Sequence, residues 1–307
     1  MKKIVILVVA ALATVMSFGQ EQEESSKKLT FAYDAGADIV SAYLWRGQYN
    51  GGLSFQPTLD LGWDSKHTSF RIGAWASVGA SDWGFRKNLP IDEENGINPN
   101  TYFVPELDVL ATVNLWGVTL GFTHYYYFNG SNFFSWNKPA QWMENERLGT
   151  NTSTTELTIG YDFSTLDLCG LYFTWNTTLA GNDFQTNKED EYILDENGNV
   201  KRNFSTYVEI GYNHSWEDLG LTLGGFVGFV PWSSALYYTS DKKFAITCVS
   251  LRLDKEWEFD ACSLDLYAQG MINPTYINKD NAYIKASGDN KLYNQTLNGC
   301  IGLGIWF

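Results

Sequence analysis

The protein has 307 residues, of which 44% are hydrophobic and 16% aromatic, and its formal net charge is −14 at pH 7. This acidic excess repels nucleic acid and anionic membrane surfaces, so the composition excludes both as partners. The three histidines are scattered and no C-x-x-C spacing occurs, so we expect neither a metal nor a cofactor. Four cysteines allow three disulfide pairings, and their spacing leaves all of them open: Cys169, Cys248, Cys262 and Cys300.

Residues 1–19 are typical of a cleavable secretory signal peptide. Two lysines precede an apolar stretch that ends in the small-x-small pattern of Ser17, Phe18 and Gly19. An uncleaved anchor is the alternative, but this stretch of about 15 residues is shorter than the roughly 20 that a spanning helix needs. Cleavage would leave Gln20 as the first residue and, because two lysines are lost, a formal charge of −16.

The next signal is a strict alternation of apolar and polar residues. From Leu53 to Trp63 the odd positions are apolar, whereas the even positions carry Ser, Gln, Thr, Asp and Gly. A period of two over about eleven residues indicates a β-strand that is longer than the usual five or six, and a tilted membrane strand needs about nine to eleven. The pattern therefore favours a membrane-spanning strand.

Similar segments recur along the chain and predict an all-β fold, a transmembrane antiparallel β-barrel of about 12 strands in an up-and-down meander. We expect a periplasmic tail over residues 20–30 and a single barrel over residues 31–307. The expected strands are residues 31–47, 53–64, 69–80, 101–115, 118–128, 153–163, 168–179, 204–216, 221–232, 244–255, 262–273 and 295–307.

The connections between these strands alternate in length. The short connections are residues 65–68, 116–117, 164–167, 217–220 and 256–261, and the long polar ones are 81–100, 129–152, 180–203 and 274–294. Short turns at one rim and long loops at the other are typical of outer-membrane barrels, with the short turns in the periplasm. An even strand number then places both termini in the periplasm. We expect a multi-pass protein of the cell outer membrane.

Aromatic residues gather at the expected strand ends, which suits the boundary between membrane and water. At the short-turn rim these are Trp63, Trp116, Phe163, Trp216, Trp257, Phe259, Trp306 and Phe307, and at the opposite rim Tyr43, Trp45, Phe55, Phe103, Tyr126, Phe128, Phe204 and Phe229. A last strand that ends in Phe307 resembles the signal read by the barrel-assembly machinery. The expected partners are this machinery, outer-membrane lipid and small polar solutes.

The polar face of the strands is expected to line the lumen. A barrel of twelve strands is wider than those that side chains fill, so polar residues can hold water or bond one another inside it. The predicted lumen-lining residues are Asp34, Asp38, Arg46, Asp60, Arg71, Glu106, Asp108, Glu156, Glu209, Arg252 and Asp265. Two interpretations fit them: the acids favour cations along a water-filled path, or the arginines and acids pair across the lumen and help to close it.

Several segments resemble the TorF family of porin-like outer-membrane proteins. The likeness begins in residues 40–47, whose sequence is VSAYLWRG, and continues through residues 55–60 and 72–77. Residues 106–108 with the tyrosines at 125–127, and residues 155–161, are also similar. The resemblance covers roughly the first half of the mature chain and implies a porin-like role without naming a solute. The long acidic loops, such as residues 188–199, depart from it.

The leading hypothesis is a narrow channel for passive diffusion of small hydrophilic solutes, with a cation preference. A lipid-modifying enzyme is a weaker alternative, because neither His124 nor His214 stands beside a serine in an arrangement that suits nucleophilic catalysis, and we expect no enzyme. A non-conducting barrel that binds partners at its surface is the other alternative. Residues 192–200 support it as a hairpin extension with Asn-Gly at its turn, although its acids miss the EF-hand spacing.

Overall fold

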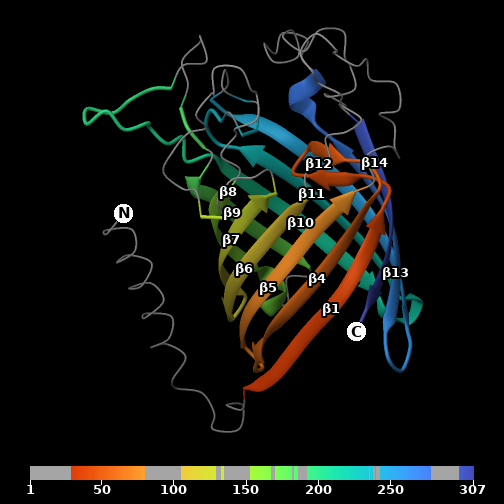
Figure 1. Ribbon diagram of the computed structural model, residues 1–307. Helices are drawn as coiled ribbons and strands as arrows, with labels where there is room; N and C mark the ends of the chain where they lie inside the picture. Colours follow the sequence, from red (N-terminus) through yellow and green to blue (C-terminus); the bar gives the residue numbers. More distant parts are fainter. Residues whose placement is uncertain are drawn as a thin grey trace.

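The computed structural model describes residues 29–79, 105–128, 133–134, 153–166, 170–181, 183–185, 192–234, 236–237, 239, 243–277 and 297–307. Most of these residues belong to one closed barrel (Figure 1). Its strands are β1 (Thr30–Val40), β4 (Ser54–Asp64), β5 (Thr68–Gly79), β6 (Glu106–Leu115), β7 (Val118–Tyr127), β8 (Ser153–Asp162), β9 (Leu171–Gly181), β10 (Thr206–Trp216), β11 (Leu221–Val230), β12 (Ala245–Glu258), β13 (Ser263–Ile272) and β14 (Leu297–Trp306). The predicted signal peptide and most of the predicted tail lie outside the described residues.

Each barrel strand pairs in antiparallel fashion with the barrel strands next to it in the chain. The ring closes where β1 pairs with β14, in a register that runs from Gly36 opposite Trp306 to Val40 opposite Gly302. This closure leaves the sheet without a free edge strand. The predicted all-β fold, an antiparallel meander of twelve strands, is confirmed.

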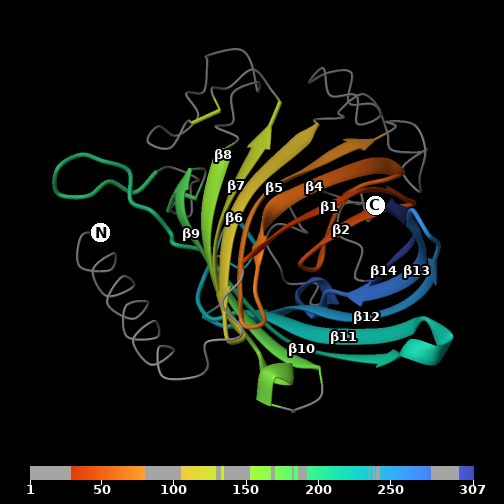
Figure 2. The ribbon, with the colours of Figure 1, turned by 90° about the horizontal axis from the view of Figure 1, so that it is seen from below.

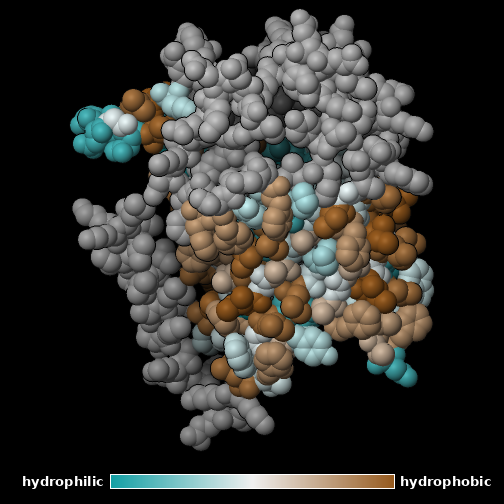
Figure 3. Space-filling model, viewed as in Figure 1, coloured by the Kyte–Doolittle hydropathy of each residue, from teal (hydrophilic) through white to brown (hydrophobic). Residues whose placement is uncertain are grey.

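The exterior of the barrel is apolar. In β14 the outward residues Ile301 and Leu303 are 62% and 51% exposed, whereas Cys300 and Asn298, which face inward, are almost fully buried. The same alternation makes Leu59, Leu251 and many other large apolar side chains exposed, and brown apolar patches cover the strands in Figure 3. A water-soluble barrel would bury this face in its core, so the arrangement is the inverse of a soluble one.

Tight connections gather at one end of the barrel, the lower end in Figure 1. Between β6 and β7 the chain turns through Trp116 and Gly117, whose φ angles of 47° and 81° are those of a two-residue type I′ turn. The other short connections are residues 65–67, the turns that contain the 3₁₀ helices η2 (Phe163–Leu166) and η3 (Glu217–Leu219), and residues 259–262. A further 3₁₀ helix, η4 (Pro274–Ile277), follows β13. No helix in the described part of the chain has the length and hydropathy to cross a bilayer.

One hairpin departs from the predicted pattern. Residues 31–47 were expected to form a single strand with a simple connection over 48–52, but β1 ends at Val40. The chain then forms β2 (Tyr43–Trp45) and β3 (Gln48–Gly51), which pair only with each other. In the view along the barrel, β2 lies inside the ring of strands (Figure 2). We call residues 43–51 the inner hairpin.

The inner hairpin also changes the predicted rim of aromatic residues. Trp45 is not at the membrane boundary, because it packs inside the barrel against a buried cluster that includes Tyr237 and Met271. The ring of Tyr43 is tilted against that of Trp75, with centroids 5.3 Å apart, and Tyr43 is hydrogen-bonded to Glu106. At the other end, Trp306 shares the inward parity of β14 and lines a cavity of the lumen. The predicted Phe103 lies outside the described residues.

The predicted hairpin extension at residues 192–200 is present in the loop after β9. Leu194 forms a bridge with Val200, and Asp195 accepts hydrogen bonds from the backbone N–H groups of Asn197 and Asn199 at 2.9 Å and 2.8 Å. These bonds, chiefly that from Asn199, hold the pKa of Asp195 below its ordinary value. The turn is therefore built by its own aspartate, as an Asx turn is.

Candidate functional site

The lumen consists of two unlike halves. Toward the long loops it is filled by the inner hairpin and by the buried cluster of Tyr207, Val230, Tyr237, Cys248 and Met271. Toward the short turns it opens into a cavity of about 1570 Å³, which we call the acidic vestibule. The inner hairpin thus stands between the vestibule and the long-loop end.

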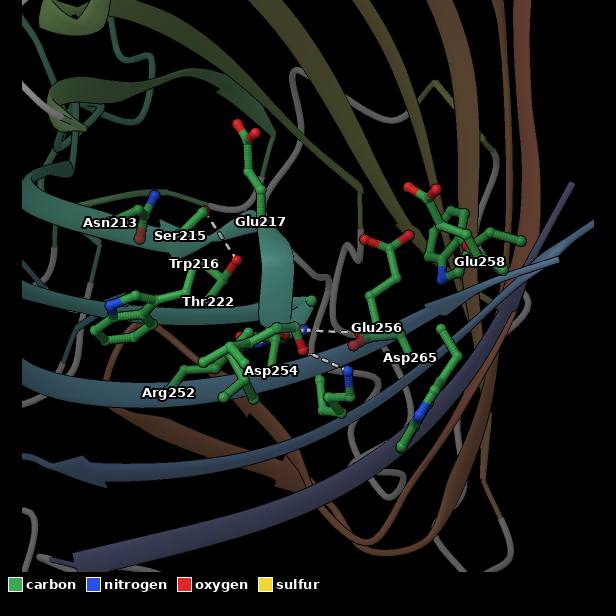
Figure 4. Close-up of a pocket in the computed structure, with 18 of the residues that line it drawn as sticks. Asn213, Ser215, Trp216, Glu217, Thr222, Arg252, Asp254, Glu256, Glu258 and Asp265 are labelled. Atoms are coloured by element: carbon green, nitrogen blue, oxygen red, sulfur yellow. Dashed lines mark hydrogen bonds and ion pairs between the residues drawn. The ribbon is translucent and has the colours of Figure 1, made fainter.

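The acidic vestibule has a strong excess of negative charge. Its lining includes eight carboxylates, namely Asp34, Asp60, Glu217, Asp218, Asp254, Glu256, Glu258 and Asp265, against the two cations Arg252 and Lys255. Figure 4 shows several of these carboxylates, with Glu217 on the η3 turn and Glu256 and Glu258 at the end of β12. Carboxylates that face one enclosed space add their fields, which attracts cations and repels anions.

Arg252 is tied to the wall of the vestibule. Its Nε donates a 2.6 Å hydrogen bond to Asp254, and its guanidinium lies 3.5 Å from Asp265 and 3.5 Å from the centre of the Tyr267 ring. This arginine neutralises part of the nearby acid, but Glu217, Glu256 and Glu258 form no ion pair with any of the described residues. The net field of the vestibule therefore remains negative.

The predicted lumen residues of the lower half lie on the inner face. Asp34, Asp60, Arg252 and Asp265 line the vestibule. Asp38 occupies the space in front of Gly304, where a Cβ atom would lie 2.3 Å from its Oδ1. In addition, Arg71 forms an ion pair with Asp64 and lies 3.9 Å from Asp34.

The predicted residues of the upper half form a buried polar cluster. Arg46, at the tip of the inner hairpin, binds Glu156 of β8 with two hydrogen bonds of 2.5 Å and 2.7 Å. Glu106, Asp108 and Glu156 are each less than a tenth exposed, and Glu209 accepts hydrogen bonds from two tyrosine hydroxyls, those of Tyr172 (2.9 Å) and Tyr207 (3.0 Å). Both interpretations of the polar face therefore have a counterpart: pairs that close the upper half, and acids that line the open lower half.

Sequence reasoning missed the inner hairpin, although the chain carries a signal for it. Arg46 and Gly47 have φ angles of 47° and 87°, nearly those of Trp116 and Gly117, so both pairs form the same two-residue turn. Reading Arg46–Gly47 as a turn would have ended the strand before it. Glu256 and Glu258 were also missed, because β12 continues to Glu258, three residues beyond the expected end.

The alternative chemistries find little support in the described residues. Both ring nitrogens of His124 are engaged, one with the Thr155 hydroxyl at 2.9 Å and the other with the Phe133 carbonyl at 2.8 Å, so this histidine is fixed in the wall. Within the described chain, no cluster of three metal-binding side chains occurs. Cys248, Cys262 and Cys300 are free thiols.

Fold and site together define a closed β-barrel with an apolar exterior and a charged interior. No family model matches the chain, and no curated protein matches it significantly, so the resemblance to the TorF family stays a prediction.

Among solved structures the chain is similar to the COG4313 outer-membrane channel from Pseudomonas putida F1, with 11% identity, coverage of 93% of this chain and 98% of the channel, and a TM-score of 0.47. It is also similar to a Pseudomonas aeruginosa FadL homologue (11% identity, 90% and 75% coverage, TM-score 0.30). A third is Salmonella typhi OmpF in complex with daunomycin (9% identity, 93% and 99% coverage, TM-score 0.28). At such low TM-scores these likenesses carry no argument about solute or mechanism.

Proposed function

We propose that the protein is an outer-membrane barrel that lets small hydrophilic solutes pass through its lumen and prefers cations. The apolar exterior supports the membrane location, because only hydrocarbon offers such a surface a favourable partner. In this proposal the short turns face the periplasm, as is usual for such barrels. The start of the first barrel strand, at Thr30, and the end of the last, at Trp306, lie on the same side.

The observation that carries the proposal is the acidic vestibule. A cavity of about 1570 Å³ inside a barrel has the volume to hold hydrated ions and small solutes, and its lining holds eight carboxylates against two cations. Such a ring of acids raises the local concentration of cations and lowers that of anions. A cation entering from the short-turn end meets this field before it reaches the inner hairpin.

Reconstitution into planar bilayers tests the proposal. Folded protein, verified by heat-modifiable gel mobility, is placed between two KCl concentrations and the reversal potential is measured. We expect a reversal potential whose sign indicates that K⁺ is more permeant than Cl⁻. This potential should move toward zero when the salt on both sides is raised at a constant ratio, because salt screens the acids. Anion preference, or no conductance from folded protein, would contradict the proposal.

A matched pair of variants locates the selectivity. Glu256→Gln removes one charge from the vestibule, whereas Asp260→Asn removes one exposed charge in the adjoining turn that does not line it. We expect the Glu256 variant to lower the K⁺ preference clearly and the Asp260 variant to change it little. Equal effects would assign the preference to the overall charge of the protein and not to the vestibule.

A further inference from the structure

The surroundings of Arg46 have the composition of a guanidinium-binding site. The Glu156 carboxylate takes the two bidentate hydrogen bonds, the Tyr237 hydroxyl accepts a third at 2.7 Å, and the Arg46 Cζ lies 4.9 Å from the centre of the Tyr207 ring. Tyr125 donates a 3.0 Å hydrogen bond to the same carboxylate. We call Tyr125, Glu156, Tyr207 and Tyr237 the guanidinium cage.

The cage keeps its shape through contacts that do not involve Arg46. Tyr125 is held by Glu156, while Tyr207 donates to Glu209 at 3.0 Å and stacks on Tyr237 with ring centres 5.6 Å apart. The backbone N–H of Tyr237 donates to Ser234 at 3.3 Å. All four cage residues belong to the barrel strands or to the connection after β11, and none belongs to the inner hairpin.

The buried Glu156 carboxylate favours a cation at this place. Glu156 is 2% exposed, and its carboxylate forms an ion pair with Arg46. A buried carboxylate without a partner is strongly unfavourable, so an empty cage would attract another cation. A planar fork of donors beside aromatic rings matches a guanidinium group better than the compact point charge of an ammonium.

The inner hairpin brings Arg46 to the cage as a separable element. Its strands pair only with each other, so its removal breaks no rung of the barrel ladder. The tip is held by side chains: Asn273 donates to the Gly47 carbonyl at 2.9 Å, and the Gly47 N–H donates to the Met271 sulfur at 3.3 Å. Trp45 stacks on Tyr237 and adds the apolar part of the contact.

We infer that the barrel wall carries a binding site for guanidinium-bearing solutes, and that Arg46 of the same chain occupies this site when the inner hairpin is docked. This inference deepens the proposed function, on which it rests for the passage of the ligand, by naming the class of solute. Arg46 is an internal substitute for that solute: a guanidinium compound that reaches the cage competes with it and favours the undocked hairpin.

The test removes the Arg46 side chain from the cage and measures whether a free guanidinium compound binds there. In Arg46→Ala, we expect methylguanidinium to bind at millimolar concentrations in isothermal titration and to raise the temperature of the heat-modifiable transition. The wild type, in which the ligand must first displace Arg46, should bind methylguanidinium at least about tenfold more weakly than Arg46→Ala and show a smaller shift of the transition. Tetramethylammonium, which has charge but no donors, should bind the variant far more weakly than methylguanidinium does. Adding Glu156→Gln should weaken methylguanidinium binding at least about tenfold, since a charge-assisted bidentate contact is lost.

A second variant keeps the inference testable if Arg46→Ala does not fold. In Gly47→Ala the new Cβ would lie 1.8 Å from the Thr247 carbonyl oxygen, at a φ of +87°. The substitution therefore displaces the tip of the inner hairpin from its contacts, although Arg46 is retained. We expect methylguanidinium binding that is weaker than in Arg46→Ala but stronger than in the wild type. Folded variants that bind no methylguanidinium, or bind it equally after Glu156→Gln, would overturn the inference. If the protein binds methylguanidinium but never conducts, the proposed function is contradicted and the binding site is still supported.

Discussion

At the scale of single residues, the environment of each side chain follows from its parity in the strand. Leu59 and Thr58 are neighbours in β4, yet Leu59 is 46% exposed on the outer face whereas Thr58 faces inward beside the lumen. This much could be predicted from the alternation in the sequence. The partner of an inward residue could not, because Arg46 and Glu156 are 110 positions apart and meet only when the inner hairpin folds back.

Leu59→Arg and Thr58→Arg form a matched pair that tests the two faces. The outward arginine is expected to lower the free energy of unfolding in lipid by about 2–4 kcal/mol, the cost of a charge near the bilayer midplane. The inward arginine should cost much less, because it enters the polar lumen and not lipid. Urea titrations in liposomes measure both values, and similar penalties would contradict the assignment of the faces.

Glycine supplies the space for the tyrosines inside the barrel. At Gly228 an added Cβ would lie 1.9 Å from the hydroxyl of Tyr207, which stands on the neighbouring strand, whereas at Gly270 nothing lies within 4 Å. We expect Gly228→Ala to destabilise the barrel by about 1–3 kcal/mol through overpacking. Gly270→Ala should be neutral or slightly stabilising, because it only removes backbone freedom from the unfolded chain. Denaturant midpoints of the two variants give the comparison, and a neutral Gly228→Ala would mean that Tyr207 is free to move.

At the scale of elements, ten of the twelve barrel strands end within three residues of the sequence prediction at both ends, because long alternation and short turns are local signals. The two others are β6, which begins at Glu106 and not at residue 101, and β1, which ends at Val40 because the inner hairpin follows it. The Arg46–Gly47 pair indicates a turn, but whether the hairpin then folds into the lumen depends on distant contacts such as Asn273 with Gly47. Local pattern carries no information about such partners.

Removing the inner hairpin tests its role as the constriction. Val40 and Ser54 are already register partners, so an Asn-Gly turn in place of residues 41–53 joins β1 to β4 without changing the barrel. We expect a folded, heat-modifiable barrel whose single-channel conductance is several-fold higher, because the upper half of the lumen loses its filling. Unchanged conductance would show that the restriction to flow lies elsewhere.

At the scale of the whole molecule, the sequence predicted the closed sheet and its inverted faces but not how the lumen is divided. Twelve strands with one apolar and one polar face can enclose either an open path or a packed interior. The packed upper half depends on the inner hairpin, and the open lower half on the acids of the short-turn end, including Glu217 and Glu258. Both depend on contacts between strands that are far apart in the chain.

The most direct measurement concerns the two faces of β12. With the native cysteines replaced by serine, a spin label is attached in turn at Leu251, Arg252, Leu253 and Asp254, and its collisions with oxygen and with a water-soluble nickel complex are compared in liposomes. The outward pair is more than two-fifths exposed on the apolar exterior, and the inward pair lines the acidic vestibule. We predict that oxygen dominates at Leu251 and Leu253 and nickel at Arg252 and Asp254. The reverse phase, or no alternation, would contradict the account of a membrane barrel around a hydrophilic lumen.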